Sequence, residues 1–252
     1  MKIAWERRGE GPPLLLIQGL GYARWGWKPV VPALARSFEV LTFDNRGIGE
    51  SDAPVGPYTA TQMAADAAQV LDEAGLQRAH VVGTSLGGMI AQELAHAHPE
   101  RVDRLVLACT TSGGPAAYPM PEQTIELLQK APTLPAAEAL RGFVVNALEP
   151  DPRPELVERI LEHRSANPQD PVAWAFQAAA AVGFDRYEDA SSLALPTLVQ
   201  HGDGDVVVDP RNSELLVQLI PDARLELYPG CGHLFFWQAP ERFVHELEEF
   251  LL

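Results

Sequence analysis

A serine lies between two glycines at residues 83–87, in the order Gly-Thr-Ser-Leu-Gly. It follows a short run rich in β-branched residues and precedes residues 89–95, which are good helix formers. Strand, sharp turn and helix form the context in which a Gly-x-Ser-x-Gly motif presents a nucleophilic serine. The glycines have a steric role, because they leave no Cβ to collide where the two backbones pass close together. The pattern therefore predicts nucleophilic chemistry on Ser85.

The same turn predicts where negative charge can be stabilised during the reaction. Backbone N–H groups at a helix N-terminus lack partners within the helix, so the N–H of Leu86 is free to donate to a developing oxyanion. A serine hydroxyl is a weak nucleophile at its own pKa and needs a general base. The motif thus requires an acid and then a histidine later in the chain.

One of the seven histidines has the placement of a general base. His233 lies in the glycine-rich and aromatic segment 229–237, after the last predicted strand and before the last predicted helix. Glycines let this loop bend back over the strand ends, and its aromatic residues could wall off water. A turn histidine with its ring in solvent is the alternative, and the presence of Ser85 upstream favours the base.

Two aspartates compete for the role of the acid that orients this histidine. The segment His-Gly-Asp-Gly-Asp, residues 201–205, continues from a buried strand predicted at 196–201. Either Asp203 or Asp205 could hold the imidazole tautomer and stabilise the imidazolium. The other would be a turn residue that hydrogen-bonds its own backbone. Spacing alone does not separate the two.

The elements around these residues alternate between apolar strands and helices. Residues 14–17 are a continuous apolar run bounded by turn signals, which is typical of a buried strand. Similar patterns predict an edge strand at 2–7, strands at 39–43, 80–83, 104–109, 196–201 and 224–228, and helices around 29–35, 59–74, 89–98, 211–220 and 240–252. This alternation predicts an α/β fold with a mostly parallel sheet and helices on both faces.

The alternation stops at residues 113–193, where no strand is predicted. Short helices broken by prolines are expected there, at 122–130, 136–148, 154–165 and 171–182. An insertion at the carboxyl ends of parallel strands lies where a lid over a ligand crevice belongs. We therefore expect a core of residues 1–112 and 194–252, with a helical lid of residues 113–193 inserted before the last two strands.

The composition argues against several classes of function. The chain has 252 residues, 46% of them hydrophobic and 21% charged, which is enough for one large core. Its formal net charge of −15 disfavours nucleic acid and anionic lipid as partners. No apolar run approaches the ~18 residues that a membrane-spanning helix needs. We therefore expect a small-molecule partner rather than a nucleic acid or a membrane.

The N-terminus and the cysteines indicate a cytoplasmic protein. Residues 1–8 lack the apolar region of a signal peptide. Cys109 and Cys231 are too few for a disulfide framework or a zinc site, so free thiols in a reducing compartment are expected. Cys231 lies near His233 in the sequence and could itself be a nucleophile, but Ser85 would then have no role. No metal and no organic cofactor is expected.

The chain resembles the α/β-hydrolases, most closely the small serine esterases and enol-lactonases. The likeness is carried by motifs along nearly the whole chain: residues 14–21, 43–51, 83–88, 101–108, 201–208 and 230–240. It implies the α/β-hydrolase fold and a small ester or lactone as substrate. Many relatives carry His-Gly where this chain has Gln18-Gly19, so the resemblance defines the loop geometry near the oxyanion site less closely. The lid, roughly residues 113–193, is the segment that the resemblance covers least, and lids set substrate choice.

The resemblance also implies roles for individual residues. In such enzymes the acid is the aspartate that matches Asp205, so the implied catalytic triad is Ser85, Asp205 and His233. The oxyanion hole would use the backbone N–H groups of Leu20 and Leu86.

Aromatic residues near the two active loops are candidates for a substrate pocket. Trp25, Trp27 and Phe235 flank these loops, and Trp174 lies on the expected lid. We expect some of them to line an acyl pocket, and the alternative is that they pack in the core. Arg24 is the nearest cation that could meet a charged substrate.

The sequence thus predicts a serine hydrolase that cleaves a small carboxylic ester through an acyl-enzyme. Lactone opening, carbon–carbon bond hydrolysis and perhydrolysis use the same triad and stay open. A dinucleotide-binding dehydrogenase is a rival, because Gly19-x-Gly21 follows a buried strand and Asp44 ends the next, but Arg24 stands where the third glycine of that motif belongs. A ligand receptor that retains the triad is the rival from another class.

Overall fold

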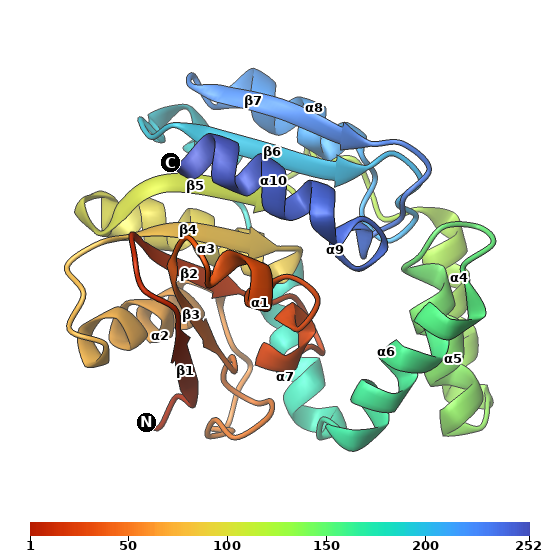
Figure 1. Cartoon of the computed structure of the whole chain (residues 1–252). Coiled ribbons are helices and arrows are strands. Elements are labelled where there is room, and N and C mark those ends of the chain that lie inside the picture. The colour runs from red at the N-terminus through yellow and green to blue at the C-terminus, as the bar shows by residue number, and fades with distance from the viewer.

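A seven-stranded sheet forms the centre of the molecule in the computed structural model, which describes all 252 residues (Figure 1). Its strands run in the order β1-β3-β2-β4-β5-β6-β7. Their bounds are β1 Trp5–Arg8, β2 Pro13–Ile17, β3 Glu39–Phe43, β4 Ala79–Thr84, β5 Val102–Ala108, β6 Thr197–Gly202 and β7 Ala223–Tyr228. Only β1 pairs antiparallel, with β3, and every other pair is parallel. The mostly parallel sheet predicted from the sequence is confirmed.

Helices cover both faces of this sheet, with α1 and α10 on one side and α2, α3 and α8 on the other (Figure 1). The bounds of the α-helices are α1 Val31–Leu34, α2 Ala60–Glu73, α3 Leu86–Ala97, α4 Glu122–Lys130, α5 Ala136–Asn146, α6 Pro154–Ala166, α7 Pro171–Val182, α8 Arg211–Leu219, α9 Phe235–Gln238 and α10 Pro240–Leu251. No helix combines the length and hydrophobicity needed to cross a bilayer.

The central strands β2 and β4 are largely apolar because both of their faces are buried. Side chains alternate along a strand, so Leu14 and Leu16 enter the hydrophobic cluster beneath α1 and α10, whereas Leu15 and Ile17 enter the cluster beneath α2 and α3. The two clusters are similar in size, with 32 and 31 buried residues, so neither face is left for solvent. Full burial of each such side chain stabilises the fold by about 1.5–3 kcal/mol.

The predicted elements differ from the observed ones mainly at the short helices. The helix expected around 29–35 is only the four-residue α1, preceded by a 3₁₀ turn at Arg24–Trp27. The sequence pattern did not indicate α9, because its aromatic residues have no helical periodicity over four positions. The long helix α2 begins as expected, with Thr59 and Gln62 forming a reciprocal capping box.

The segment between β5 and β6 is the helical insertion, formed by α4, α5, α6 and α7, and Figure 1 shows α4–α6 standing off one end of the sheet. Its helices match the expected ranges within two residues at each end. Two of the contacts between the insertion and the loops of the core lie close to the predicted site residues. The N–H of Leu234 donates to Ala147 O at 2.8 Å, and the hydroxyl of Thr124 donates to Val206 O.

The turn between β4 and α3 is as crowded as its glycines indicate. A Cβ on Gly87 would lie 2.1 Å from Ile17 O, and a Cβ on Gly83 would lie 2.2 Å from Gly87 O. No side chain fits at such distances, so the backbone of α3 approaches both β2 and β4 only because these positions are glycine.

We expect Gly87→Ala to lower the free energy of unfolding by about 2–4 kcal/mol, because the methyl group overlaps a backbone oxygen that cannot move away. Gly75→Ala is the matched control, since Gly75 has a φ of 74° but no atom within 4 Å of its Cβ position. That variant should lose only about 1–2 kcal/mol, for its left-handed backbone. Urea unfolding measures both, and equal losses would contradict the steric explanation.

Candidate active site

Ser85 lies at the tip of the β4–α3 turn in a strained backbone conformation. Its φ of 54° and ψ of −121° are rarely adopted by a residue with a side chain. The surroundings hold it there, because the N–H of Ser85 donates to Ala108 O at 2.9 Å and the hydroxyl of Thr110 donates to Ser85 O at 2.8 Å. The side chain is half-buried, so its hydroxyl remains accessible. Strain of this kind at a partly exposed serine is typical of a nucleophile.

The loop after β2 lies directly against this serine. A methyl group on Gly19 would lie 3.0 Å from Ser85 Cβ and 3.6 Å from Ser85 Oγ. The N–H of Leu20, next along this loop, and the N–H of Leu86, at the start of α3, have no hydrogen-bond partner within the protein. Two free donors beside one serine hydroxyl are what an oxyanion hole requires.

Gln18 supports the same loop through its side chain and its main-chain oxygen. Its Oε1 accepts hydrogen bonds from Gly19 N at 3.2 Å and from the Thr84 hydroxyl at 3.4 Å. Its main-chain oxygen accepts from the Asn45 amide at 2.8 Å. The glutamine therefore ties the loop to the strand that precedes Ser85.

His233 follows β7 in a loop that is fixed from both the core and the insertion. Gly230 N donates to Asp203 Oδ1 at 2.7 Å, and Gly204 N donates to Cys231 O at 2.9 Å. The neighbouring residue Leu234 is bound by α5, as described above. The glycines do allow this loop to pass close to other backbone, since a Cβ on Gly232 would lie 2.5 Å from a main-chain oxygen of the insertion.

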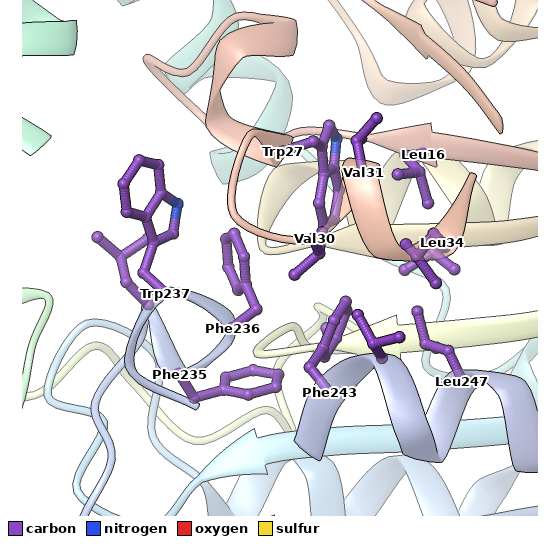
Figure 2. Packing of buried hydrophobic residues seen from close by; sticks show 14 of the residues in the cluster. Leu16, Trp27, Val30, Val31, Leu34, Phe235, Phe236, Trp237, Phe243 and Leu247 are labelled. Carbon is purple, nitrogen blue, oxygen red and sulfur yellow. The ribbon is translucent and has the colours of Figure 1, made fainter. Parts of the chain in front are cut away.

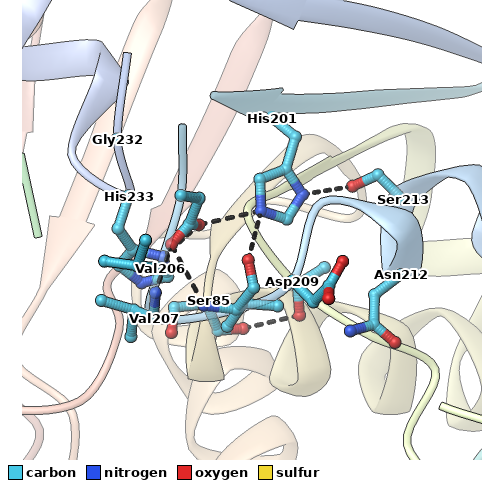
Figure 3. A network of polar contacts seen from close by, with 12 residues as sticks. Ser85, His201, Val206, Val207, Asp209, Asn212, Ser213, Gly232 and His233 are labelled. Carbon is cyan, nitrogen blue, oxygen red and sulfur yellow. Dashed lines mark hydrogen bonds and ion pairs between the residues drawn. The ribbon is translucent and has the colours of Figure 1, made fainter. Parts of the chain in front are cut away.

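Asp205 is the aspartate that contacts this histidine. His233 Nδ1 lies 2.6 Å from Asp205 Oδ2, and the other carboxylate oxygen accepts from Val207 N at 2.7 Å and Val208 N at 3.1 Å (Figure 3). Asp205 is 4% exposed and His233 is 8% exposed. Asp203 is exposed and bonds the backbone of Gly230 instead, so the two candidates that the sequence left open have different surroundings.

The charges of this pair shift both of its pKa values. Burial alone would raise the pKa of Asp205, but the charge of His233 and hydrogen bonds from His201 and His233 outweigh it and hold the pKa well below its ordinary value. Burial would lower the pKa of His233, whereas the Asp205 carboxylate, followed by the Cys109 thiol, raises it well above its ordinary value. The pair is therefore suited to stabilise an imidazolium.

Ser85 and His233 come from neighbouring loops at the carboxyl ends of the strands and are seen together in Figure 3, but no hydrogen bond joins them. Catalytic hydrogen bonds are often long in the absence of substrate and shorten when it binds. The arrangement combines a strained serine, two free N–H donors and a histidine oriented by a buried carboxylate. Such a set can carry out acyl transfer.

The aromatic residues proposed for the pocket divide into two groups. Trp27 and Phe235 are fully buried and pack with Phe236 and Phe243 between α1, α9 and α10 (Figure 2). They belong to the hydrophobic core rather than to an open pocket, because α9 is part of the core wall.

Trp25 and Trp174 lie nearer to the insertion. Trp25 stacks on His163 of α6, with ring centroids 5.4 Å apart. Trp174 of α7 places its Nε1 within 3.4 Å of the position that a Cβ on Gly21 would occupy. Trp174 therefore lies next to the loop that carries Leu20.

Arg24 cannot meet a substrate at Ser85, contrary to the expectation from the sequence. Its guanidinium forms ion pairs with Glu6, Asp44 and Glu50. Asp44 in turn accepts from the main-chain N–H groups of Arg24 and Glu50, so it organises a loop rather than a ribose site. A cleft of about 720 Å³ lies over this cluster and is not lined by Ser85 or His233.

Two residues at the site were not indicated by the sequence. His201 contacts the same carboxylate oxygen of Asp205 as His233 does, and the only sequence signal for it was its place in the motif at residues 201–205. Arg164 of α6 reaches Gly21 O at 2.7 Å, and an insertion of unknown orientation gave no signal for it. Cys231 is half-buried and burial raises the pKa of its thiol, which disfavours it as a nucleophile.

Comparison with known proteins agrees with the fold described above. A family model described as the alpha/beta hydrolase fold matches residues 12–240. A 2-hydroxy-6-oxononadienedioate/2-hydroxy-6-oxononatrienedioate hydrolase from Burkholderia vietnamiensis is 32% identical over 275 residues, with 100% of this chain and 91% of the relative covered.

Solved structures match over nearly the full length of the chain. A hydrolase from Pseudomonas aeruginosa PA01 is 33% identical with a TM-score of 0.84, and the match covers 99% of this chain and 94% of that one. The enol-lactonase from Burkholderia xenovorans LB400 is 28% identical with a TM-score of 0.85, and the match covers 99% and 96%.

We expect Asp205→Asn to lower kcat for a p-nitrophenyl ester by about 10³–10⁴-fold, because the neutral amide neither orients the histidine nor stabilises its charged form. A base must be neutral to act, so the raised pKa of His233 places the acid limb of kcat/KM above the range of an ordinary histidine. Loss of the carboxylate should move this limb to lower pH. Steady-state rates across pH measure both effects.

Asp203→Asn is the matched control for this prediction. Asparagine retains the oxygen that accepts from Gly230 N, so activity should stay within about threefold of wild type. Equal losses in the two variants would remove Asp205 from the role of the acid.

Proposed function

The chain belongs to the α/β-hydrolase family, and on that premise we propose that it is a serine hydrolase that cleaves a small carboxylic ester through an acyl-enzyme on Ser85. The observation that supports this best is the position of Ser85. Its strained turn lies against a loop with a free N–H, and the neighbouring loop carries a histidine bound to a buried carboxylate.

The first half of the reaction forms the acyl-enzyme. Nε2 of His233 takes the proton of the Ser85 hydroxyl as the oxygen attacks the ester carbonyl. The carbonyl oxygen becomes an oxyanion and accepts from the N–H groups of Leu20 and Leu86, each worth about 3 kcal/mol to the transition state. Asp205 holds Nδ1–H of the ring and stabilises the imidazolium, which then protonates the leaving alcohol.

The second half returns the enzyme to its starting state. Water takes the place of the alcohol, and His233 removes a proton from it as it attacks the acyl carbon. The same two N–H groups stabilise the second tetrahedral intermediate. Collapse releases the carboxylic acid and returns the proton to Ser85. Apart from the substrate and one water molecule, these steps use groups that the chain itself supplies.

An ester or a lactone with a carboxylate of its own is the second candidate substrate, because Arg164 is a cation near the site that a neutral substrate does not need. Arg164 is half-buried, and no carboxylate lies within 4 Å of its guanidinium. It donates to Gly21 O and lies 4.9 Å from the centre of the Tyr22 ring. Burial raises the pKa of Tyr22, while the charges of Arg164 and His233 act against it.

An unpaired guanidinium beside the oxyanion loop favours a substrate with its own carboxylate. The Burkholderia vietnamiensis relative is named for a dioate, and one structural neighbour is named as an enol-lactonase. Ring opening of a lactone uses the same serine chemistry as ester cleavage. An ester or a lactone that carries an acidic group fits Arg164 better than a simple acetate does.

Ser85→Ala tests the nucleophile. We expect purified wild-type protein to hydrolyse p-nitrophenyl acetate or butyrate, and the variant to lose about 10⁴-fold or more in kcat, since no other group can form the acyl-enzyme. Circular dichroism controls for folding. Turnover that persists in Ser85→Ala would remove this residue from its role, and wild-type protein without turnover on esters or lactones would favour a receptor.

Arg164→Gln tests the charge of the substrate. For mono-p-nitrophenyl succinate we expect kcat/KM to fall about tenfold, through loss of a charge-assisted hydrogen bond, while the value for p-nitrophenyl butyrate stays within about twofold. Arg159→Gln on the same helix is the control, because Arg159 lies over Trp237 rather than beside the oxyanion loop. Equal changes for both esters would exclude recognition of a carboxylate by Arg164.

A further inference from the structure

A second buried histidine contacts the acid of the proposed triad. His201, near the end of β6, is fully buried, and its Nε2 lies 2.8 Å from Asp205 Oδ2. This is the same carboxylate oxygen that His233 Nδ1 contacts at 2.6 Å. The two imidazoles therefore share one oxygen atom, which neither the serine mechanism nor the fold by itself requires.

The surroundings of His201 define where its proton lies. Nε2 also lies 3.1 Å from Val208 O, so it faces a carboxylate and a carbonyl, both of which can only accept. Nε2 must therefore carry the hydrogen. On the other side of the ring, Nδ1 lies 2.5 Å from the hydroxyl of Ser213 on α8, which can donate to an unprotonated nitrogen (Figure 3).

A neutral ring is the form that suits the reaction. The charged and titratable groups around His201 are Asp205 and His233, with Asp209 in the following loop. When His233 becomes an imidazolium, the charge of Asp205 balances it. A second imidazolium on the same buried carboxylate would leave an excess positive charge away from water, which is strongly unfavourable.

We propose that His201 is a positioning residue of the active site, held as the neutral Nε2–H tautomer by Ser213, and that it orients Asp205 and limits the negative charge that reaches His233. This rests on the proposed function of Ser85 and His233. The chain of contacts runs from the Ser213 hydroxyl through His201 and Asp205 to His233, and so connects α8 to the catalytic base.

Loss of His201 should change the pKa of His233 in a way that general destabilisation of the fold would not. A donor to Asp205 Oδ2 draws off part of the charge that holds a proton on His233. Without this donor, the full charge acts on His233, and the imidazolium becomes harder to deprotonate. Loss of His201 should therefore move the acid limb of kcat/KM to higher pH, which is opposite to the effect of losing the carboxylate itself.

His201→Phe and His201→Gln form the matched pair that tests this. Phenylalanine fills the volume of the ring but donates no hydrogen bond to Asp205. We therefore expect kcat to fall about 10–100-fold, as when a residue that orients a metal-bound histidine is lost. KM should stay within about threefold, and the acid limb of kcat/KM should move to higher pH. Glutamine retains an N–H near the position of Nε2, so its kcat and its acid limb should stay close to wild type. Thermal unfolding of each variant reports on folding.

Three results would overturn the proposal: equal losses in both variants, an acid limb that does not move in His201→Phe, or wild-type activity in that variant. If Ser85→Ala is inactive while His201→Phe is fully active, only the role of His201 fails. If Ser85→Ala retains turnover, the proposed function fails and the role of His201 fails with it.

A measurement on the wild-type protein tests the proton assignment without any variant that might not fold. In ¹⁵N-histidine NMR spectra of the active protein, we expect the His201 ring to show a protonated Nε2 and an unprotonated Nδ1. The opposite tautomer, with the hydrogen on Nδ1, would overturn the proposal even if activity depends on the residue.

Discussion

The buried carboxylate of Asp205 is the constraint on which the catalytic end of the molecule depends. A carboxylate removed from water is strongly destabilising unless hydrogen bonds and opposite charge replace its lost hydration. Two histidines and two main-chain N–H groups do so here, at 2.6–3.1 Å. These donors belong to β6, to the turn after it and to the loop after β7. The Asp205 carboxylate thus holds three segments in place. His233 takes its orientation because its ring must donate a hydrogen bond to this carboxylate.

The sheet explains why such distant parts of the chain can meet. Its parallel strands end at one edge, where the loops after β2, β4, β6 and β7 carry the proposed oxyanion donor Leu20, the proposed nucleophile Ser85, the proposed acid Asp205 and the proposed base His233. Strand β5 lies between β4 and β6, and so it connects the strand before Ser85 with the strand before Asp205. Ala108 O at its end accepts from Ser85 N, and Cys109 N donates to Gln200 O of β6. The relative position of nucleophile and acid therefore depends on ordinary strand pairing.

Much of this arrangement could be predicted from residue patterns, because they report local burial and backbone restrictions. The glycines around Ser85 and the apolar strands are of this kind, and so are the helices of the insertion. What a pattern cannot report is which side chain faces inward across a tertiary contact. Asp203 and Asp205 differ only in what lies beside them, Trp27 and Phe235 are core because α9 packs on α10, and Arg164 depends on how α6 is placed against the core.

The insertion contacts both the loop that carries His233 and the turn that carries Asp205. These contacts connect the placement of the insertion with the orientation of these two residues. The main chain of α5 binds the residue after His233, and Thr124 of α4 binds the turn that satisfies Asp205. A ligand that displaces these helices must therefore also disturb the base and its acid. By reciprocity, whatever orders Asp205 and His233 also favours one placement of these helices. Under the proposed function, the placement of the insertion and the readiness of the base to react are therefore thermodynamically linked.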